Sequence, residues 1–343
     1  MKHIYLLFLI SVLMFSCNTN LGQTTSDKID YIVKSAYKDG DFTGAVLVTD
    51  KGKVVYKNSF GMADAGHNVP VTDSTKFLIA SLSKPLTAVL ILRLAEQGKL
   101  GLHDKVSKYI TSLDGYKSGN ITIHQLLTHT SGIAEVIGEK HPFNKWDLLN
   151  NKFDFEPGTD FKYSNSGYVI LKEIAQVASG KSYPELMSKE IFIPAGMSSS
   201  GIARDIKQIK NLASGYKTPH QTDAAPINYS LEIVDGAGSV YATAMDLYKF
   251  DRALASGELL SPQSVNLMLQ QHVKEKYGYG WFLRERGGDW NTSYHKGNLL
   301  GYTAYISRQK TKHQCIILLA NAENMELDDM ERDIAKVLKS SNE

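Results

Sequence analysis

The sequence predicts an α+β fold in which both ends of the chain give strands to one antiparallel β-sheet, helices flank the sheet, and an all-helical lobe is inserted. Two observations support this prediction. Strand-like segments lie at residues 44–56 and 277–320, whereas residues 121–197 are mostly helical with glycine and proline between the helices. The cleft between a sheet and such a lobe is a natural place for a functional site.

The first residues are expected to form a targeting segment. Lys2 precedes an apolar run at residues 4–15, which is too short to span a membrane and suits a signal peptide. Ser16 and Cys17 follow, and a small residue before cysteine at this point resembles a bacterial lipoprotein cleavage site. The sequence therefore predicts that Cys17 carries a lipid, with an ordinary secreted protein as the alternative.

These features divide the chain into three parts. Residues 1–16 are predicted to be the signal peptide, 17–27 a polar tether and 28–343 the folded domain. The mature protein is thus expected to be exported, as a periplasmic protein or a lipoprotein of the outer or cell membrane.

The first folded elements are expected to be a helix and a hairpin. Ser26 and Asp27 are capping residues for an amphipathic helix that ends near Gly40. Strands at 44–49 and 53–56 follow, and the short turn between them contains a glycine.

Residues 77–98 form the longest helical pattern, and it is apolar on nearly all sides, which indicates a buried helix. Gly98 is expected to end it. Proline is tolerated only near the start of a helix, so Pro85 places Ser81 at or just before the first turn and Lys84 one turn in.

Ser81 and Lys84 form one of five Ser-x-x-Lys matches, and the other four begin at Ser35, Ser214, Ser293 and Ser307. Only Ser81 stands at the start of a buried helix, where the positive end of the helix dipole favours developing negative charge. Residues three apart share one helix face, so the amine of Lys84 can lie beside the hydroxyl of Ser81. Such a neighbour can activate a serine as a nucleophile.

The remaining elements are predicted from periodicity and turn residues. Helices are expected at 121–127, 168–178 and 244–254, with a loop at 200–230 that could cover the site. The C-terminal third returns to strands at 277–283, 299–307 and 315–320 and ends in a helix at 326–338.

Two further motifs follow Ser81 in the chain. They are Tyr163-Ser164-Asn165 and His295-Lys296-Gly297, the second directly before a predicted strand. In this order the three motifs resemble the signature of the serine β-lactamase and penicillin-binding superfamily, in its Tyr-x-Asn branch. Flanking phrases match as well, at 126–132, 156–158 and 277–281, and the resemblance covers residues 27–338. It implies a β-lactamase/transpeptidase-like fold.

The resemblance also implies roles for the motif residues. Ser81 would be the acylated nucleophile, and either Lys84 or Tyr163 would take its proton, a choice that the sequence leaves open. Asn165 would hold the substrate amide and the lysine.

The same resemblance places an oxyanion hole at two backbone N–H groups. They belong to Ser81 and to Asn298, the residue after Gly297. Two such donors aimed at the developing oxyanion are often the largest catalytic contribution.

Two departures from the family pattern bear on the substrate. His295 stands where a dedicated β-lactamase of this branch has lysine, and Lys296 stands where a threonine hydroxyl often helps to hold a substrate carboxylate. Both argue against an efficient β-lactamase. A neutral His295 would also stabilise a Tyr163 phenolate less than lysine does, so the rate should depend on its protonation.

The composition and the motifs of the chain argue against several other classes of protein. A formal net charge of +2 with no dense basic run predicts no nucleic-acid binding. His124 and His129 are wrongly spaced for one helix face, so we expect no metal, and no cofactor motif competes. Cys315 is the only cysteine besides Cys17 and is expected to pack in the core without a disulfide.

The sequence thus predicts an exported serine hydrolase that forms an acyl-enzyme on Ser81 and needs neither metal nor cofactor. Its partner would be a small-molecule or peptide substrate, and it would meet a membrane only through the lipid on Cys17. A peptidase or amidase for D-amino-acid peptides ranks level with a small-ester esterase, and β-lactamase ranks third. A penicillin-binding sensor without turnover is the alternative from another class, and no oligomeric state is predicted.

Overall fold

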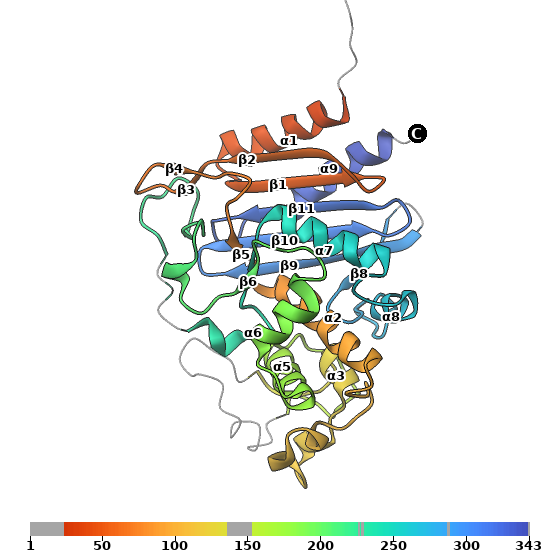
Figure 1. The fold of residues 1–343 in the computed structure, drawn as a ribbon. Helices are drawn as coiled ribbons and strands as arrows, with labels where there is room; N and C mark the ends of the chain where they lie inside the picture. Colours follow the sequence, from red (N-terminus) through yellow and green to blue (C-terminus); the bar gives the residue numbers. More distant parts are fainter. Residues whose placement is uncertain (1–23, 136–152, 226, 228–229, 287–288, 342–343) are drawn as a thin grey trace, which may run out of the picture.

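A six-stranded antiparallel sheet forms one half of the molecule (Figure 1). The computed structural model describes residues 24–135, 153–225, 227, 230–286 and 289–341. The strand order is β2-β1-β11-β10-β9-β8. Their bounds are β1 Gly44–Asp50, β2 Lys53–Phe60, β8 Phe282–Arg286, β9 Asp289–Leu299, β10 Tyr302–Gln309 and β11 Gln314–Ala320.

The two ends of the chain meet in the middle of this sheet. Strand β1 pairs with β11 in a register that runs from Gly44 opposite Ala320 to Thr49 opposite Cys315. The side chains of both strands are almost all buried, which explains their continuous apolar sequence. The prediction that both termini build one antiparallel sheet is confirmed.

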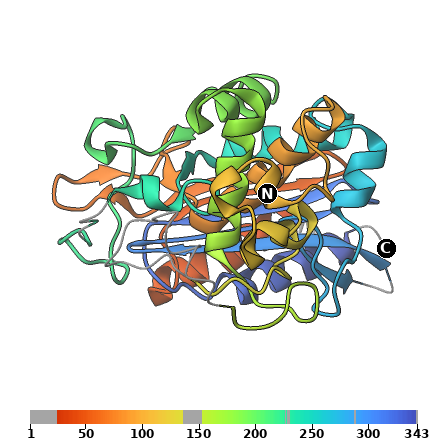
Figure 2. The ribbon, with the colours of Figure 1, turned by 90° about the horizontal axis from the view of Figure 1, so that it is seen from below.

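Helices cover the two faces of the sheet, because successive side chains along a strand point to opposite faces. Helices α1 (Thr25–Asp39) and α9 (Leu327–Ser340) lie on one side, and α7 (Ala244–Ser256) lies on the other (Figure 2). Val46 and Leu318 pack with α1 and α9, whereas Leu47 and Ile317 belong to the larger core that contains α2 and α7.

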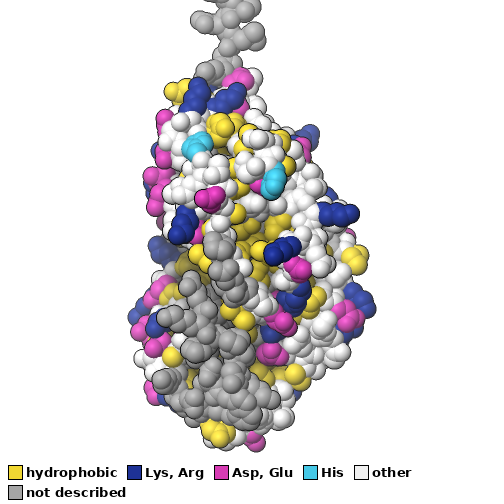
Figure 3. Space-filling model, turned by 90° about the vertical axis from the view of Figure 1, so that its left-hand side faces the viewer, with side chains coloured by type: hydrophobic (Ala, Val, Ile, Leu, Met, Phe, Trp, Pro, Cys, Tyr) yellow, Lys and Arg dark blue, Asp and Glu magenta, His cyan; other side chains and the backbone are white. Residues whose placement is uncertain are grey.

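The second half is a helical lobe centred on α2 (Ser83–Glu96), most of whose residues are buried. Around it lie α3 (Ile123–Leu127), α5 (Asn165–Ser179), α6 (Tyr183–Leu186), the π-helix η5 (Met187–Phe192) and α8 (Pro262–Met268). Hydrophobic side chains gather midway down the face in Figure 3, at the height where sheet and lobe meet. Within the part of the chain that the structure describes, no helix is long and apolar enough to cross a membrane.

Short elements connect these parts. The small strands are β3 Met62–Asp64, β4 Val69–Pro70, β5 Phe77–Leu78, β6 Gly201–Ile202 and β7 Val240–Ala242. The 3-10 helices are η1 Ala80–Leu82, η2 Val106–Lys108, η3 Thr111–Leu113, η4 Lys117–Asn120, η6 Ile206–Gln208 and η7 Leu231–Val234.

Two predicted element starts near the N-terminus were wrong. Helix α1 is capped by Thr24, which forms a capping box with Asp27, so residues 25–27 are the first helical turn rather than tether. The pattern at 77–98 begins with β5 and η1, and the α-helix itself starts at Ser83. The left-handed backbone of Ala80, with φ of 48°, is incompatible with a continuous α-helix there.

Boundaries in the rest of the chain also differ from the prediction. Helix α5 begins at Asn165 rather than at residue 168, and α8 was not predicted. The His295 motif lies inside β9 instead of before a strand, because the turn to β10 comes only after Leu299. Residues 277–281 contribute one isolated bridge, Tyr277 to Phe282, and the strand starts at Phe282. The signal peptide and Cys17 lie outside the described residues.

Candidate active site

Ser81 and Lys84 lie together at the junction of η1 and α2, as their spacing predicted. The amine Nζ of Lys84 is 3.1 Å from Oγ of Ser81. Ser81 follows Ala80, whose left-handed backbone ends β5 and turns the chain into the helix. A separation of this size permits direct proton transfer between hydroxyl and amine.

The Lys84 amine also meets two acceptors that have no proton to donate there. Oδ1 of Asn165 lies 2.7 Å from Nζ, and the backbone oxygen of Ala237 lies 3.0 Å from it. A neutral amine has two N–H groups and one lone pair. If the N–H groups are directed to Asn165 and Ala237, the lone pair is left for the hydroxyl of Ser81.

Burial makes the neutral amine accessible near neutral pH. Lys84 is fully buried, and this lowers its pKa from 10.5 to about 7. The carboxylate of Glu135 acts in the opposite direction and keeps the pKa from falling further. A lysine in this state can serve as a base, which an ordinary surface lysine cannot.

Tyr163 lies beside the same amine, but its pKa is shifted away from neutrality rather than towards it. Nζ of Lys84 is 4.7 Å from the centroid of the Tyr163 ring. Among the described residues the buried phenol oxygen has no hydrogen-bond partner, and burial raises the pKa of Tyr163 well above 10, an effect that the Ser81 hydroxyl only partly opposes. Tyr163 is therefore protonated at neutral pH.

A segment after α3 holds the Tyr163–Asn165 motif by its backbone. The backbone N–H of Ser164 donates to Nδ1 of His129 at 3.1 Å. The Glu135 carboxylate accepts the backbone N–H groups of Asn165 at 2.7 Å and Ser166 at 3.1 Å. These are first N–H groups of α5, which lack partners within the helix and favour an anion.

Glu135 was missed by the sequence prediction. It stands three residues after Gly132, and no local pattern distinguishes it from an exposed loop glutamate. Its role depends on the start of α5 at Asn165, which comes from a distant part of the sequence.

His295 lies inside the site, against the aromatic residues that line it. Its ring centroid is 6.1 Å from that of Tyr163, and the side chain is 1% exposed. Nδ1 lies 2.7 Å from the backbone oxygen of Lys296, so this nitrogen carries the proton. Burial, reinforced by the charge of Lys84, lowers the pKa of His295 to about 3, so the ring is neutral at pH 7.

The two buried histidines are joined through Tyr277. Nε2 of His129 is 3.1 Å from the Tyr277 hydroxyl, which is 3.5 Å from Nε2 of His295. Because Nδ1 of His129 accepts from Ser164, its Nε2 donates to Tyr277, whose own proton is directed to His295. The backbone thus fixes the tautomer of each ring.

Gly297 brings strand β9 against the backbone of the segment that carries Ser81. A Cβ atom at this position would lie 2.3 Å from the Ile79 oxygen and 3.2 Å from the Ser81 nitrogen. Only glycine permits so close an approach. Asn298 is the next residue and pairs with Thr303 of β10. This places Gly297 beside the Ser81 backbone, and the oxyanion role of the Ser81 and Asn298 N–H groups stays a prediction.

Lys296 points away from the site. It forms an ion pair with Asp328 at the start of α9, and α9 covers the opposite face of the sheet. Cys315 is buried, as predicted. Within the described ranges, no group of three or more His, Cys, Asp or Glu side chains could hold a metal ion.

The sheet, the lobe and the serine–lysine pair define a class of serine active-site proteins, and comparison with known proteins gives the family. The family model described as Beta-lactamase matches residues 29–339. The chain belongs to this β-lactamase/transpeptidase-like family, which includes serine hydrolases.

Two relatives in sequence are named as penicillin-binding proteins. The chain is 32% identical over 314 residues to "Penicillin-binding protein 4*" of Bacillus subtilis (strain 168), covering 82% of this chain and 68% of the relative. It is 31% identical over 296 residues to "Putative penicillin-binding protein PbpX" of the same strain, covering 85% and 74%.

Solved structures share the fold. "A class C beta-lactamase" superimposes with a TM-score of 0.82 at 23% identity, covering 95% of this chain and 98% of that one. A penicillin-binding protein from Bacillus halodurans gives a TM-score of 0.76 at 24% identity, covering 91% and 99%. The predicted fold and family are therefore confirmed.

Proposed function

We propose that this protein is a serine hydrolase that forms an acyl-enzyme on Ser81 with Lys84 as the general base. One observation carries the proposal. The amine of Lys84 is buried, has a pKa lowered to about 7 and lies 3.1 Å from Oγ of Ser81. Tyr163 has a raised pKa and keeps its proton, so Lys84 is the better base of the two that the sequence left open.

The reaction would take two steps. In the first, Oγ of Ser81 bonds to the acyl carbon while its proton passes to the neutral Lys84 amine, and the bond to the leaving group breaks as the leaving group gains a proton. Tyr163 is placed to donate that proton and to regain one from Lys84. In the second, water attacks the acyl carbon and gives a proton to Lys84. The bond between the acyl carbon and Oγ then breaks, Oγ regains that proton from Lys84, and the acid is released.

The charges around Ser81 favour an uncharged acyl donor. His295 is neutral, Lys296 is paired with Asp328, and the Glu135 carboxylate acts on both Lys84 and Tyr163. The part of strand β9 that the structure describes at the site therefore offers no free cation to a substrate carboxylate. A neutral ester is favoured over a D-amino-acid peptide with a free carboxylate, and a β-lactam antibiotic ranks third.

Steady-state hydrolysis of matched substrates tests this proposal. We would compare an uncharged p-nitrophenyl ester, the same ester with a carboxylate beside the scissile bond, a D-alanyl-D-alanine peptide and a chromogenic cephalosporin. We expect kcat/KM to be highest for the uncharged ester and to decrease through the carboxylate-bearing ester and the peptide to the cephalosporin. Ser81→Ala should turn over none of them. Labelling of Ser81 without turnover of any substrate would instead indicate a penicillin-binding sensor.

We also propose that the protein is exported and carries a lipid on Cys17. The support is the sequence of residues 1–17 alone. Mass spectrometry of the mature N-terminus from the membrane fraction tests it. An unmodified N-terminus other than Cys17 would exclude the lipid.

A further inference from the structure

The segment Asp235–Ser239 forms the wall behind the Lys84 amine. It joins η7 to β7 and lies along the first turns of α2. The oxygen of Ala237 contacts Nζ of Lys84 at 3.0 Å, and the oxygen of Gly236 accepts from Oγ1 of Thr87 at 2.7 Å. The position of this backbone therefore decides whether Lys84 has its second acceptor.

Glycine lets the segment fit between two helices. Gly236 has φ of 87°, and a Cβ on it would lie 2.3 Å from the backbone oxygen of Tyr168 in α5. The segment thus packs directly against α5 on one side and against α2 on the other. The segment has little room on either side, and anchors at its ends would keep it in one conformation.

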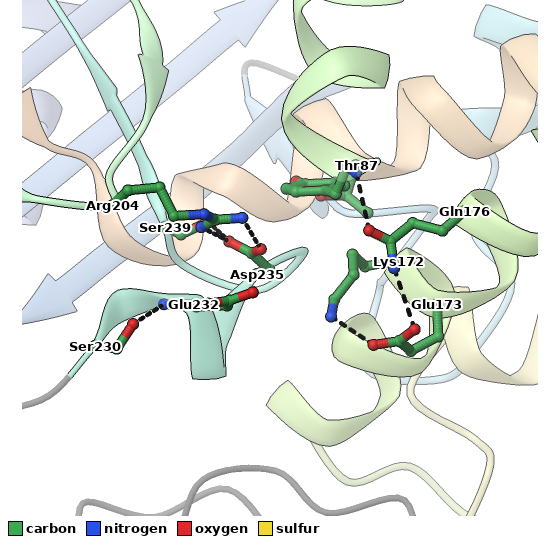
Figure 4. Close-up of polar contacts among 10 residues, drawn as sticks. Thr87, Lys172, Glu173, Gln176, Arg204, Ser230, Glu232, Asp235 and Ser239 are labelled. Carbon is green, nitrogen blue, oxygen red and sulfur yellow. Dashed lines mark hydrogen bonds and ion pairs between the residues drawn. The ribbon is translucent and has the colours of Figure 1, made fainter. Parts of the chain in front are cut away.

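Asp235 supplies the anchor through a buried carboxylate that is only 2% exposed. NH1 of Arg204 donates to its Oδ1 at 2.9 Å and NH2 donates to its Oδ2 at 2.5 Å (Figure 4). The hydroxyl of Ser239 donates to Oδ1 at 2.5 Å, which ties together the two ends of the segment. Two parallel bonds between a guanidinium and a carboxylate fix orientation as well as distance.

We propose that Asp235 is a positioning residue for the reaction at Ser81: through Arg204 and Ser239 it fixes the segment 235–239 so that the Ala237 oxygen covers and orients the Lys84 amine. This inference rests on the proposed function, because it assigns Lys84 as the base.

Loss of the Asp235 anchor should change the pKa of Lys84 rather than the affinity for the substrate. Asp235→Asn keeps the shape of the side chain but removes the charge that holds Arg204. A looser segment admits water to the amine, and since burial is the main cause of its low pKa, the pKa should rise from about 7.

Other groups around the amine are unchanged by this substitution. Tyr163 and Tyr168 face it with their rings at 4.7 and 5.7 Å, and Glu135, His129 and His295 interact with its charge. A change in the lysine therefore reports on the segment 235–239.

The fold contains a control in a second Asp–Arg pair, whose aspartate is buried like Asp235. Oδ1 of Asp251 on α7 accepts from Nε of Arg308 on β10 at 2.7 Å, and both side chains are about 5% exposed or less. Asp251→Asn should lower the melting temperature at least as much as Asp235→Asn, because Arg308 is buried whereas the Arg204 side chain is 36% exposed. Neither residue of this pair contacts Lys84 or Ser81 in the described part of the chain.

The experiment measures the acylation burst with a neutral p-nitrophenyl ester as a function of pH. Asp235→Asn should lower the acylation rate constant about 10-fold or more, leave the apparent binding of the ester unchanged and move the acid limb to higher pH. Arg204→Gln should do the same, and the double variant should add little. Asp251→Asn should stay within about 2-fold of the wild type.

Two results would overturn the inference. One is an acylation rate constant in Asp235→Asn that equals that of the wild type, with the acid limb of its pH profile at the same pH. The other is an equal loss of rate in Asp251→Asn at an equal loss of melting temperature, since this would show a general effect of stability.

A second measurement does not depend on turnover. NMR titration of lysine ¹³Cε resonances, with Lys84 assigned by Lys84→Met, gives the pKa of the amine directly. A higher pKa in Asp235→Asn but not in Asp251→Asn supports the inference even if no ester is hydrolysed, and an unchanged pKa contradicts it. An inactive wild type would contradict the proposed function separately.

Discussion

The two sides of Ser81 are built differently. On the helix side, Lys84 is buried and contacts Ser81, Asn165 and the Ala237 oxygen within 3.1 Å. On the strand side, His295 is also buried, but its contacts are the backbone of Lys296 and a longer one of 3.5 Å to Tyr277. The helix side holds a group that can change its protonation near pH 7, and the strand side holds a group that stays neutral.

The two sides therefore have different proposed roles: the helix side would activate Ser81, and the strand side would select the substrate. A base needs a low pKa and close contact with the nucleophile, and both are present at Lys84. A fixed positive charge favours recognition of a carboxylate, and His295 does not provide one at neutral pH. Under the proposed function, the group that activates Ser81 and the groups that select the substrate therefore lie on different sides of the site.

The largest effect should come from removing the base on the helix side. Lys84→Met keeps the volume of the side chain but leaves Ser81 without a proton acceptor. We expect acylation by a neutral ester to fall on the order of 10³-fold. Stopped-flow measurement of the burst checks this, with Lys249→Met on α7 as the control. A rate near that of the wild type would mean that Tyr163 or another group is the base.

A charge added to the strand side should change substrate preference. His295→Lys places an amine where the site now has a neutral ring, so kcat/KM for a carboxylate-bearing ester should rise about 10-fold relative to its neutral analogue. The pH profile should change as well. Lys296→Met is the control, because that side chain points to Asp328. An unchanged ratio and pH profile would place His295 outside the site.

Acid should destabilise the fold in part through His295. The unfolded His295 binds a proton near pH 6.5, whereas the folded one resists it down to about pH 3. Between these values the unfolded state binds more protons, so stability falls as pH drops, by up to about 1.4 kcal/mol per pH unit for one such group. Urea unfolding from pH 7 to 4 should show a shallower loss in His295→Gln. The exposed His67→Gln should match the wild type, and equal slopes in all three proteins would refute the assignment.

The smallest effect is expected from the carboxylate that acts on the helix side. Glu135 raises the pKa of Lys84, so Glu135→Gln should move the acid limb of kcat/KM to lower pH and increase the rate a few-fold below pH 7. Because Gln still accepts one N–H at the start of α5, the fold should persist. Glu156→Gln, which removes an exposed ion pair with Lys117, should leave the limb in place. A shift to higher pH would contradict the electrostatic role.

The motif residues could be predicted from sequence because their local context is strong. The proline after Lys84 and the apolar run beyond it fix where α2 starts, and this singles out Ser81 among five matches. The order of the three motifs then predicts that Tyr163 and His295 come near Ser81. The structure places Tyr163 beside Lys84 and His295 beside Tyr163.

The supporting contacts could not be predicted in this way. The oxygen of Ala237 is a backbone atom without a residue signature, and Asp235 acts through Arg204, which is 31 positions away. Glu135 acquires its role only because α5 begins at Asn165. These contacts arise because the fold brings together residues that are far apart in the sequence, and the residue types alone do not reveal them.

The most direct test of the account is to locate the acyl group during turnover. The protein is mixed with a neutral p-nitrophenyl ester, quenched with acid in the burst phase, and analysed by intact mass and peptide mapping. We predict a single acyl adduct on Ser81 that is absent from Ser81→Ala and that forms too slowly to be trapped in the burst phase of Lys84→Met. An adduct on any other residue, or the same adduct formed at the wild-type rate by Lys84→Met, would contradict the central claim.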